Sequence, residues 1–385
     1  MRVQAGQRVR SSGRRCRAVA AGVVAGVMVT GVLAVPAGAV GPGAPPVAVQ
    51  RGLDRLVRDD GVPGALASVQ DRQGHSRTYT AGVGDVVTGV EVPRDGQVRV
   101  GSNTKTFTAV VVLQLVTEGK VALDASVETY LPGLLRGDGI DGRRITVRQL
   151  LQHTSGLPDY THYLGEDIRF YAPGELLDLA LAHEAHFAPG AKWEYSNTNY
   201  LVAGLLVEKV TGRSLAEQIE RRVVRRIGLR HTYFPAPGEV ALRERHPRGY
   251  DQESAGAPLV DATEWDPSWA WAAGQMVSTN SDLNRFFGAL LSGRLLPKAQ
   301  LDQMRTTVAA TYPFPAGARY GLGLVSRPLS CGGVFWGHGG SMTGYETLGG
   351  VAGNGRAVSV AVTTQPGATT KEHMGDVVDA ALCAR

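Results

Sequence analysis

The chain has 385 residues, of which 43% are hydrophobic and 19% are charged. These values are ordinary for a globular protein, and the length is sufficient for one large domain or two interlocked ones. The formal net charge is +5, but residues 1–39 hold six arginines and no acidic residue, so the remainder carries −1. This balance excludes the basic surface that nucleic-acid binding requires, and no nucleic-acid partner is expected.

The N-terminus has the pattern of an export signal. A basic start is followed by an apolar run over residues 18–35 and by a small-x-small cleavage pattern that ends at Ala39. This pattern predicts a secretory signal peptide over residues 1–39, cleaved near Ala39, and a secreted mature protein. The alternative is an uncleaved anchor, but the apolar run is at the short edge for crossing a bilayer, so no stable membrane anchor is expected. Arg14 and Arg15 leave general and twin-arginine export both open.

Beyond the leader, the sequence predicts strands near both ends of the chain and a helix-rich middle. Residues 40–48 are rich in glycine and proline and are predicted to be a linker. Strands are predicted at 65–71, 77–84, 320–325, 334–337, 345–351 and 358–363. Three- and four-residue spacing of apolar residues predicts helices at 51–58, 102–118, 176–185, 200–210, 281–291 and 371–382.

This order of elements predicts an α+β fold, in which an antiparallel β-sheet is flanked by helices and carries an inserted, mainly α-helical domain. The sheet domain is expected to be discontinuous, over residues 49–120 and 271–385, and the helical insert to cover residues 121–270. A cleft between the two is the natural place for a functional site. The chain is expected to act as a monomer.

Two cysteines follow the leader, Cys331 and Cys383. In an exported chain, an even pair predicts a disulfide, which would stabilise the fold by about 4 kcal/mol in the chain-entropy account. No cluster has the spacing of a zinc site, because His183 and His186 are three residues apart and the metalloprotease pattern needs four. No metal and no other cofactor is expected.

Ser102 and Lys105 are the first candidates for chemistry. A serine hydroxyl needs a base within hydrogen-bond reach to act as a nucleophile, and residues three apart on a helix face the same side. The start of a helix also favours a developing alkoxide through the helix dipole. The alternative is an N-cap serine with an exposed lysine. The chain has six lysines against 34 arginines, and only lysine can give up its proton, which favours the catalytic interpretation.

Two further segments strengthen that interpretation. Tyr195 and Asn197 offer a phenol that can pass a proton to a leaving nitrogen and an amide that can orient a lysine and a substrate. His338, Gly339 and Gly340 follow a predicted strand, and the two glycines let the backbone approach a substrate closely. Each segment alone is typical of a turn, so the indication of a site comes from their combination.

Together these segments resemble the serine β-lactamase and penicillin-binding superfamily, which has Ser-x-x-Lys, a Ser-Asp-Asn-type element and Lys-Thr-Gly in this chain order. The Tyr-x-Asn and His-x-Gly versions found here are similar to the branch of secreted D-alanyl-D-alanine carboxypeptidases and class C-like β-lactamases and esterases. Similar stretches are ITVRQLLQHTSGL at 145–157, YSNTNY at 195–200 and GLGL at 321–324. The resemblance covers residues 50–383.

The resemblance implies an acyl-enzyme mechanism. The implied catalytic residues are Ser102 as nucleophile, Lys105 as base, Tyr195 as proton relay, Asn197 as positioning group, and His338, which keeps the Tyr195 and Ser102 side of the site in register. The oxyanion hole would consist of the backbone N–H groups of Ser102 and Ser341, each worth about 3 to 4 kcal/mol. Trp269 resembles a wall of the substrate pocket, and ordinary core packing is the alternative.

One departure from the related pattern concerns a substrate carboxylate. The relatives have a threonine or serine directly after the third-motif His or Lys, where this chain has Gly339. Carboxypeptidase relatives also have an arginine on the preceding strand, where this chain has Val325. Arg327 lies two residues further and would face the same side of a strand. Arg327 and Ser341 are therefore predicted to share the binding of the carboxylate, with Gly339 and Gly340 beside the substrate.

The leading functional prediction is a secreted D-alanyl-D-alanine carboxypeptidase or β-lactamase that acts on peptidoglycan-type peptides or β-lactams. Because of Gly339 and Val325, an esterase or D-amino-acid amidase on the same scaffold is the first alternative. The second is a penicillin-binding sensor that is acylated without turnover, although such a sensor normally carries a membrane span.

Overall fold

The computed structural model describes residues 45–165, 168–254 and 256–384, and the predicted signal peptide lies outside them. Residues Pro42–Arg385 form one compact unit. Among the described residues, no helix has both the length and the apolar composition needed to cross a bilayer.

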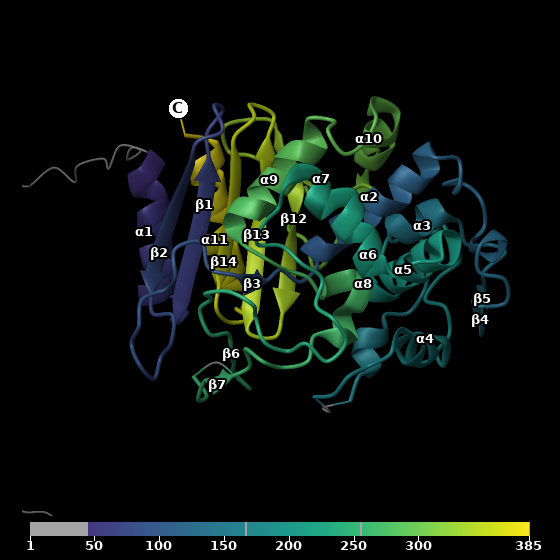
Figure 1. Cartoon of the computed structure of the whole chain (residues 1–385), viewed down its shortest axis with the longest axis horizontal. Coiled ribbons are helices and arrows are strands. Elements are labelled where there is room, and N and C mark those ends of the chain that lie inside the picture. Colours follow the sequence, from purple (N-terminus) through teal and green to yellow (C-terminus); the bar gives the residue numbers. More distant parts are fainter. Residues whose placement is uncertain (1–44, 166–167, 255, 385) are drawn as a thin grey trace, which may run out of the picture. The chain divides into compact units, whose positions relative to one another are not determined.

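The sheet of the described residues is antiparallel and draws its strands from both ends of the chain (Figure 1). Its spatial order is β2 (Ser76–Gly82), β1 (Gly64–Gln70), β14 (Ala357–Val362), β13 (Tyr345–Ala352), β12 (Val334–Met342), β11 (Val325–Pro328), β10 (Arg319–Tyr320) and β9 (Val308–Ala309). The N-terminal hairpin joins the C-terminal strands through β1 and β14, where Ala65 lies opposite Val362. The predicted α+β class is confirmed.

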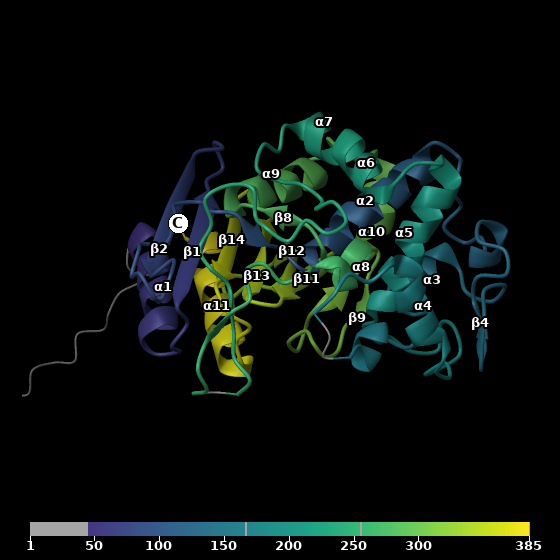
Figure 2. The same cartoon turned by 60° about the horizontal axis from the view of Figure 1, so that its bottom comes forward.

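Helices cover both faces of this sheet because its strands alternate their side chains between two apolar cores. Ala65 and Ala67 belong to the core beneath α1 (Pro45–Arg58) and α11 (Ala368–Leu382), whereas Leu66 belongs to the core on the opposite face. On that opposite face, α9 (Asn280–Leu291) packs against β1, β13 and β14. Figure 2 shows α1 and α11 beside the strands at the sheet end of the molecule.

The middle of the chain is mainly helical. Its helices are α2 (Asn103–Thr117), α3 (Val147–Leu151), α4 (Pro173–Leu181), α5 (Asn197–Thr211), α6 (Leu215–Ile219), α7 (Arg225–Ile227), α8 (Trp271–Gly274) and α10 (Lys298–Arg305), with short 3-10 and π turns η1 (Val127–Thr129), η2 (Tyr160–Tyr163), η3 (Glu220–Val224) and η4 (Ser268–Ala270). Short strand pairs are β3 (Val98–Arg99) with β8 (Val277–Ser278), β4 (Arg136–Gly137) with β5 (Ile140–Asp141), and β6 (Tyr250–Asp251) with β7 (Val260–Asp261). Helix α2 connects the two parts, because it contacts β12 as well as α5 and α8.

Several boundaries differ from the sequence predictions. The strand predicted at 334–337 continues to Met342 as β12, so His338, Gly339 and Gly340 lie within it and do not follow it. Helix α1 begins at Pro45, inside the predicted linker, since proline suits the first turn of a helix, where no N–H donor is needed. The strand predicted at 320–325 is divided, because a tight turn in which Gly321 N–H donates to the Leu324 carbonyl separates β10 from β11. Helix α4 ends at Leu181, because the N–H of Ala185 donates to Asp138 instead of continuing the helix.

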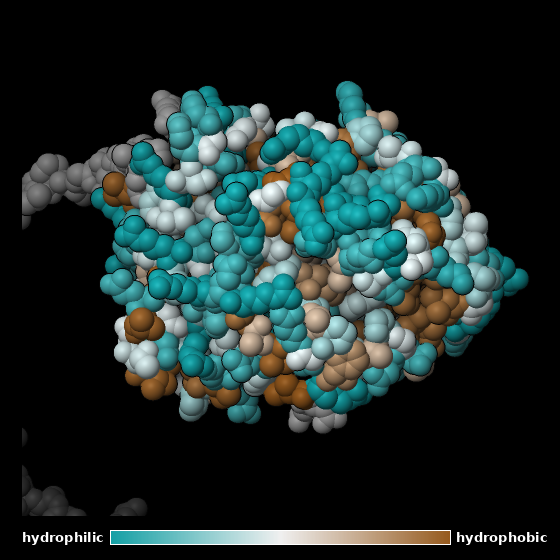
Figure 3. Space-filling view, viewed as in Figure 1, coloured by the Kyte–Doolittle hydropathy of each residue, from teal (hydrophilic) through white to brown (hydrophobic). Residues whose placement is uncertain are grey.

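The predicted disulfide between Cys331 and Cys383 is present and is confirmed. It joins the turn between β11 and β12 to the end of α11, across a sequence separation of 52 residues. On the face that Figure 3 shows, the surface is mostly hydrophilic and apolar residues lie in small separate groups.

Candidate active site

Ser102 lies directly before the buried helix α2. Its backbone is already helical (φ −63°, ψ −6°), and its side chain makes no capping hydrogen bond, so the hydroxyl is not used to start the helix. Lys105 is 0% exposed. The alternative of a capping serine beside an exposed lysine is therefore wrong. Lys105 is not exposed because residues 103–115 of α2 are all buried, which leaves its side chain no path to solvent.

Three groups surround the amine of Lys105. The Nζ atom lies 2.9 Å from Ser102 Oγ, 2.6 Å from Asn197 Oδ1 and 2.9 Å from the carbonyl oxygen of Ala273. The two carbonyl oxygens can only accept hydrogen bonds. A neutral amine has two N–H groups and one lone pair, so its N–H groups satisfy Asn197 and Ala273 while the lone pair faces Ser102.

The electrostatic surroundings favour this neutral form. Burial lowers the pKa of Lys105 from 10.5 to about 7, and the nearby carboxylate of Asp159 opposes the shift only in part. A large fraction of the amine is therefore neutral at physiological pH. A neutral amine in contact with a serine hydroxyl is the arrangement that activates serine as a nucleophile.

Asn197, the first residue of α5, connects Lys105 to a buried carboxylate. Its Oδ1 accepts from Lys105, and its Nδ2 donates to Asp159 Oδ2 at 2.9 Å. Each end of the amide has a partner of the opposite kind, so a single orientation of Asn197 satisfies both. Asp159 thereby fixes the amide that holds the base, and sequence reasoning did not identify it.

Tyr195 lies beside the same amine, with Lys105 Nζ 4.8 Å from the centroid of its ring. Burial raises the pKa of Tyr195 above its ordinary value, while a hydrogen bond with Ser102 opposes that shift. The phenol is therefore protonated at neutral pH and is able to donate. This state suits the delivery of a proton to a leaving nitrogen.

His338 is connected to His153 through Tyr320. The Tyr320 hydroxyl lies 3.1 Å from Nε2 of His338 and 3.2 Å from Nε2 of His153. On its other side, Nδ1 of His153 lies 3.2 Å from the backbone N–H of Ser196, which can only donate. His153 Nδ1 is therefore the acceptor, and Nε2 carries the proton and donates to Tyr320. The backbone of His153 has φ +59°, a conformation that is unusual for a residue other than glycine.

The same reasoning fixes the proton on His338. His338 Nδ1 lies 2.5 Å from the Gly339 carbonyl, which can only accept, so Nδ1 carries the proton and Nε2 accepts from the Tyr320 hydroxyl. Burial lowers the pKa of His338 to about 3 and that of His153 well below its ordinary value, so both rings are neutral. His338 is thus linked to the Tyr195 side of the site indirectly, through Tyr320 and through His153, whose ring lies 4.4 Å from that of Tyr195.

Strand β12 lies directly against the segment that carries the nucleophile. A Cβ atom placed on Gly340 would overlap the Val100 carbonyl and lie 2.8 Å from the backbone nitrogen of Ser102. A Cβ atom on Gly101 would lie 2.7 Å from the backbone nitrogen of Ser341. Close approach of the two backbones therefore needs glycine at both positions. It brings together the two segments whose N–H groups, on Ser102 and Ser341, are the predicted oxyanion donors.

The predicted site residues meet at one cleft of 730 Å³. Those that line it are Ser102, Tyr195, Asn197, Trp269, Arg327, His338, Gly339, Gly340 and Ser341, with Lys105 buried behind Ser102. The structure thus gathers every residue predicted for catalysis or substrate binding, and their individual roles remain predictions.

Arg327 lines this cleft from β11. It pairs with Phe335 across β11 and β12, and its guanidinium carbon is 5.7 Å from the centroid of that ring. A Cβ atom on Gly375 of α11 would lie 3.4 Å from Arg327 Nη2, so the guanidinium extends towards that helix. Among the described residues, no carboxylate pairs with Arg327. Arg327 and Ser341 line the same cleft, and their shared binding of a substrate carboxylate stays a prediction. The Ser341 hydroxyl also has a partner within the protein.

That partner is Glu346, directly opposite Ser341 across β12 and β13. The Ser341 hydroxyl donates to Glu346 Oε2, and Lys371 Nζ of α11 lies 3.3 Å from the same oxygen. The Glu346 side chain is 12% exposed and also lines the cleft. Burial raises the pKa of Glu346, and the Lys371 ammonium opposes the shift.

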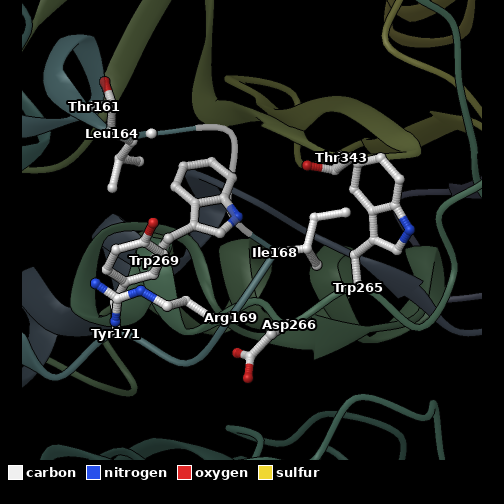
Figure 4. Close-up of a pocket in the computed structure, with 10 residues that line it drawn as sticks. Thr161, Leu164, Ile168, Arg169, Tyr171, Trp265, Asp266, Trp269 and Thr343 are labelled. Atoms are coloured by element: carbon white, nitrogen blue, oxygen red, sulfur yellow. The ribbon is translucent and has the colours of Figure 1, made fainter.

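A second pocket of 290 Å³ adjoins the cleft, since Thr161 and Trp269 line both. In Figure 4, the indole rings of Trp265 and Trp269 lie on either side of Ile168. Arg169 covers Tyr171, with its guanidinium carbon 4.0 Å from the ring centroid. The pocket is therefore mainly aromatic and apolar, which suits a large apolar group of a ligand.

Within the described ranges, no three His, Cys, Asp or Glu side chains gather in a way that could hold a metal ion. His183 and His186 have other partners: His183 stacks on Tyr163 with ring centroids 3.5 Å apart, and His186 pairs with Glu194.

The residues that sequence reasoning missed are Asp159, His153, Tyr320, Glu346 and Lys371. His153 and Tyr320 lie in or beside stretches already noted for their resemblance, so those stretches contained a signal. Lys371 is one of only six lysines, and the scarcity that favoured Lys105 applies to it as well. Asp159 and Glu346 have no such signal, because strand register and loop packing bring them to the site.

Comparisons with known proteins place similar sequences over almost all of the described chain. The sequence profile of the Beta-lactamase family matches residues 49–382. Protein flp of Staphylococcus aureus (strain MW2) is 26% identical over 71% of this chain, which spans only 55% of the length of that relative. Penicillin-binding protein 4 of Amycolatopsis lactamdurans is 32% identical over 68% of this chain and 69% of its own length.

Solved structures with similar folds include two amide-cleaving enzymes. A D-stereospecific amidohydrolase from Streptomyces sp. is 41% identical, with a TM-score of 0.79, and the match covers 88% of this chain and 99% of that one. D-amino acid amidase from Ochrobactrum anthropi SV3 is 29% identical, with a TM-score of 0.77, and the match covers 87% of this chain and 98% of that one.

Proposed function

The chain belongs to the Beta-lactamase family of serine hydrolases, and from this membership we propose that it is a secreted amidase that cleaves amides of D-amino acids through an acyl-enzyme. The observation that carries the proposal is the contact of the buried Lys105 Nζ with Ser102 Oγ at 2.9 Å, since the two other partners of this amine, Asn197 Oδ1 and the Ala273 carbonyl, can only accept. The choice of amides as substrates is supported by the 41% identity to the D-stereospecific amidohydrolase, in a match that covers 88% of this chain and 99% of that one.

In the proposed mechanism, Ser102 Oγ attacks the carbonyl carbon and its proton passes to Lys105 Nζ. The oxyanion accepts hydrogen bonds from the backbone N–H groups of Ser102 and Ser341, which are in position before the substrate binds. The C–N bond then breaks, and the proton passes from Lys105 through Tyr195 to the leaving nitrogen. Water attacks the resulting ester with the same groups acting in reverse, which releases the acid and restores Ser102.

The aromatic pocket between Trp265 and Trp269 favours a substrate whose acyl part carries a large apolar side chain. It adjoins the cleft at Trp269 and Thr161, which line both. We therefore take an aromatic D-amino acid amide, such as D-phenylalanine amide, as the representative substrate.

The test is a comparison of turnover for D-phenylalanine amide, L-phenylalanine amide, a D-Ala-D-Ala peptide, nitrocefin and a p-nitrophenyl ester, with the wild type and Ser102→Ala. We expect the D-amide to be cleaved at least about 100-fold faster than the L-amide, and every activity to be lost in Ser102→Ala, as for removal of a nucleophile. Equal rates for the two enantiomers would contradict the proposal. Intact mass after incubation with a β-lactam identifies the acylated residue and detects an enzyme that is acylated without turnover.

A D-alanyl-D-alanine carboxypeptidase or β-lactamase is the second candidate. It is supported by the 32% identity to Penicillin-binding protein 4 and by the guanidinium of Arg327, which no carboxylate neutralises in the described part of the chain. Faster turnover of the peptide or of nitrocefin than of D-phenylalanine amide would favour this candidate.

Secretion and the monomeric state are also proposals. The leader pattern over residues 1–39 supports export, and N-terminal sequencing of protein recovered from culture medium tests it, with a mature start expected at Val40. Light scattering of the purified protein tests the monomer.

A further inference from the structure

Glu346 places a carboxylate next to a predicted oxyanion donor. Ser341 supplies that backbone N–H, and its own hydroxyl donates to Glu346 Oε2. The pairing of Ser341 with Glu346 across β12 and β13 puts both side chains on one face of the sheet, together with Gly339 one pleat away. Glu346 and Ser341 both line the cleft that contains Ser102.

The surroundings of Glu346 bear on which leaving group fits here. The only hydroxyl on this stretch of β12 is that of Ser341, and it is already engaged. Gly339 offers no hydroxyl to replace it. A terminal carboxylate at this point would therefore meet a carboxylate at close range in a largely buried place, where like charges repel more strongly than in water. An N–H group of a leaving amide would instead find an acceptor.

We propose that Glu346, held by Ser341, forms a leaving-group subsite that accepts the N–H groups of a carboxamide or of an amine and rejects a free terminal carboxylate. The inference rests on the proposed amidase function and names its substrate class: primary amides, and amides whose leaving amine carries no carboxylate. Glu346 is a specificity residue in this account and takes no part in bond breaking.

Lys371 sets the strength of this selection. Its Nζ atom lies 3.3 Å from Glu346, and its side chain is 47% exposed, so it offsets part of the negative charge from the solvent side. Removing Lys371 leaves the carboxylate unbalanced, whereas removing the charge of Glu346 leaves a cation that attracts a carboxylate. The two substitutions are therefore expected to change the selectivity in opposite directions.

The experiment compares D-phenylalanine amide with the free acid D-phenylalanyl-D-alanine in the wild type, Glu346→Gln and Lys371→Met. We expect Glu346→Gln to raise kcat/KM for the free acid, relative to that for the amide, at least about tenfold, a change worth about 1.4 kcal/mol. We expect Lys371→Met to lower the same ratio. Asp376→Asn is the matched control: its carboxylate is on the same helix as Lys371 but pairs at 3.6 Å with Arg55 and is 71% exposed, so selectivity should stay unchanged.

Binding is measured alongside turnover, as inhibition constants of the amide and the free acid against hydrolysis of a p-nitrophenyl ester. A wild type that does not cleave the amide overturns the proposed function, while the ratio of inhibition constants still tests the subsite. Selectivity that moves less than twofold in Glu346→Gln, or that moves in the same direction in both variants, overturns the subsite. If circular dichroism shows that Glu346→Gln does not fold, Lys371→Met alone tests the subsite. A decrease in selectivity for the free acid then supports it, and an increase or no change overturns it.

Discussion

The hydroxyl of Tyr320 is the hydrogen-bond donor to Nε2 of His338, over 3.1 Å, because the Gly339 carbonyl holds the ring proton of His338 on Nδ1. Tyr320→Phe keeps the ring and removes that donor. We expect the free energy of unfolding to fall by about 1–3 kcal/mol, the cost of leaving a buried acceptor unsatisfied. We also expect kcat/KM to fall about tenfold, because His338 of β12 loses its hydrogen bond to Tyr320.

Nitrogen-15 NMR of the histidine side chains separates this role from a merely structural one. The wild type should show His338 protonated at Nδ1, and Tyr320→Phe should keep that proton on Nδ1 but shift the Nε2 resonance, because Nε2 loses its hydrogen-bond donor. The buried Tyr250 hydroxyl, which lies away from the cleft and accepts from the N–H of Val86, gives the control Tyr250→Phe, with no change at His338. An unchanged His338 spectrum in Tyr320→Phe would contradict the assigned proton positions.

The pH dependence of acylation should report the state of Lys105. Its pKa is lowered to about 7, so the amine is protonated below that pH and cannot take the proton of Ser102. We therefore expect kcat/KM to rise with pH through about 7 and then level off. Lys105→Ala should lose this rise together with a factor of about 10²–10⁴ in rate, the usual contribution of a positioned base. A wild-type profile that is flat between pH 5.5 and 8.5 would be incompatible with Lys105 as the base.

The aromatic pocket predicts which acyl groups are preferred. Trp265 forms one of its walls without lining the catalytic cleft. Trp265→Ala should lower kcat/KM for D-phenylalanine amide by about 10–100-fold, which corresponds to losing about 1–3 kcal/mol of apolar contact. Activity on D-alanine amide, which does not reach the pocket, should change less than threefold and serves as the internal control. An equal loss on both substrates would indicate a collapsed site rather than a missing wall.

The disulfide should stabilise the end of α11. Cys331 and Cys383 are 52 residues apart, so the cross-link removes a large loop entropy from the unfolded chain. Replacing both cysteines with serine should lower the free energy of unfolding by about 3–4 kcal/mol, as measured by urea denaturation. The same loss should follow reduction of the wild type with dithiothreitol, and a reduced wild type as stable as the oxidised one would contradict this expectation.

The sequence predictions succeeded where the chemistry is local. Ser102 and Lys105 are one helical turn apart, so their contact follows from the helix alone. The glycines at 339 and 340 were predicted to let the backbone approach a substrate, which stays a prediction, and the structure adds that Gly340 also lies against Val100. The alternation of apolar residues likewise predicted the hairpin at 65–84, because alternation directly reports the two faces of a strand.

The predictions failed where contacts depend on register or on distant loops. Glu346 faces Ser341 only because β12 and β13 pair with those two residues opposite each other, and a shift of one residue would turn Glu346 to the other face. Arg327 lines the cleft with Val325, as its spacing on the strand predicted, but its contact with the ring of Phe335 depends on the register of β11 with β12 and had no signal in the sequence. Tyr320 joins two histidines that are 185 positions apart in numbering, from 153 to 338, and no local pattern indicates such a link.

The pairing of β1 with β14 has a consequence for how the chain reaches its native state. During synthesis, Ala65 can pair with Val362 only after almost all of the chain has been made. Until β14 is available, the edge of β1 that pairs with it stays unpaired. Contacts of such sequence separation slow folding. The nucleophile segment, which follows that hairpin, and strand β12, which precedes β14, can come into register only at this late step, so catalytic competence should appear in refolding experiments together with closure of the sheet and not before it.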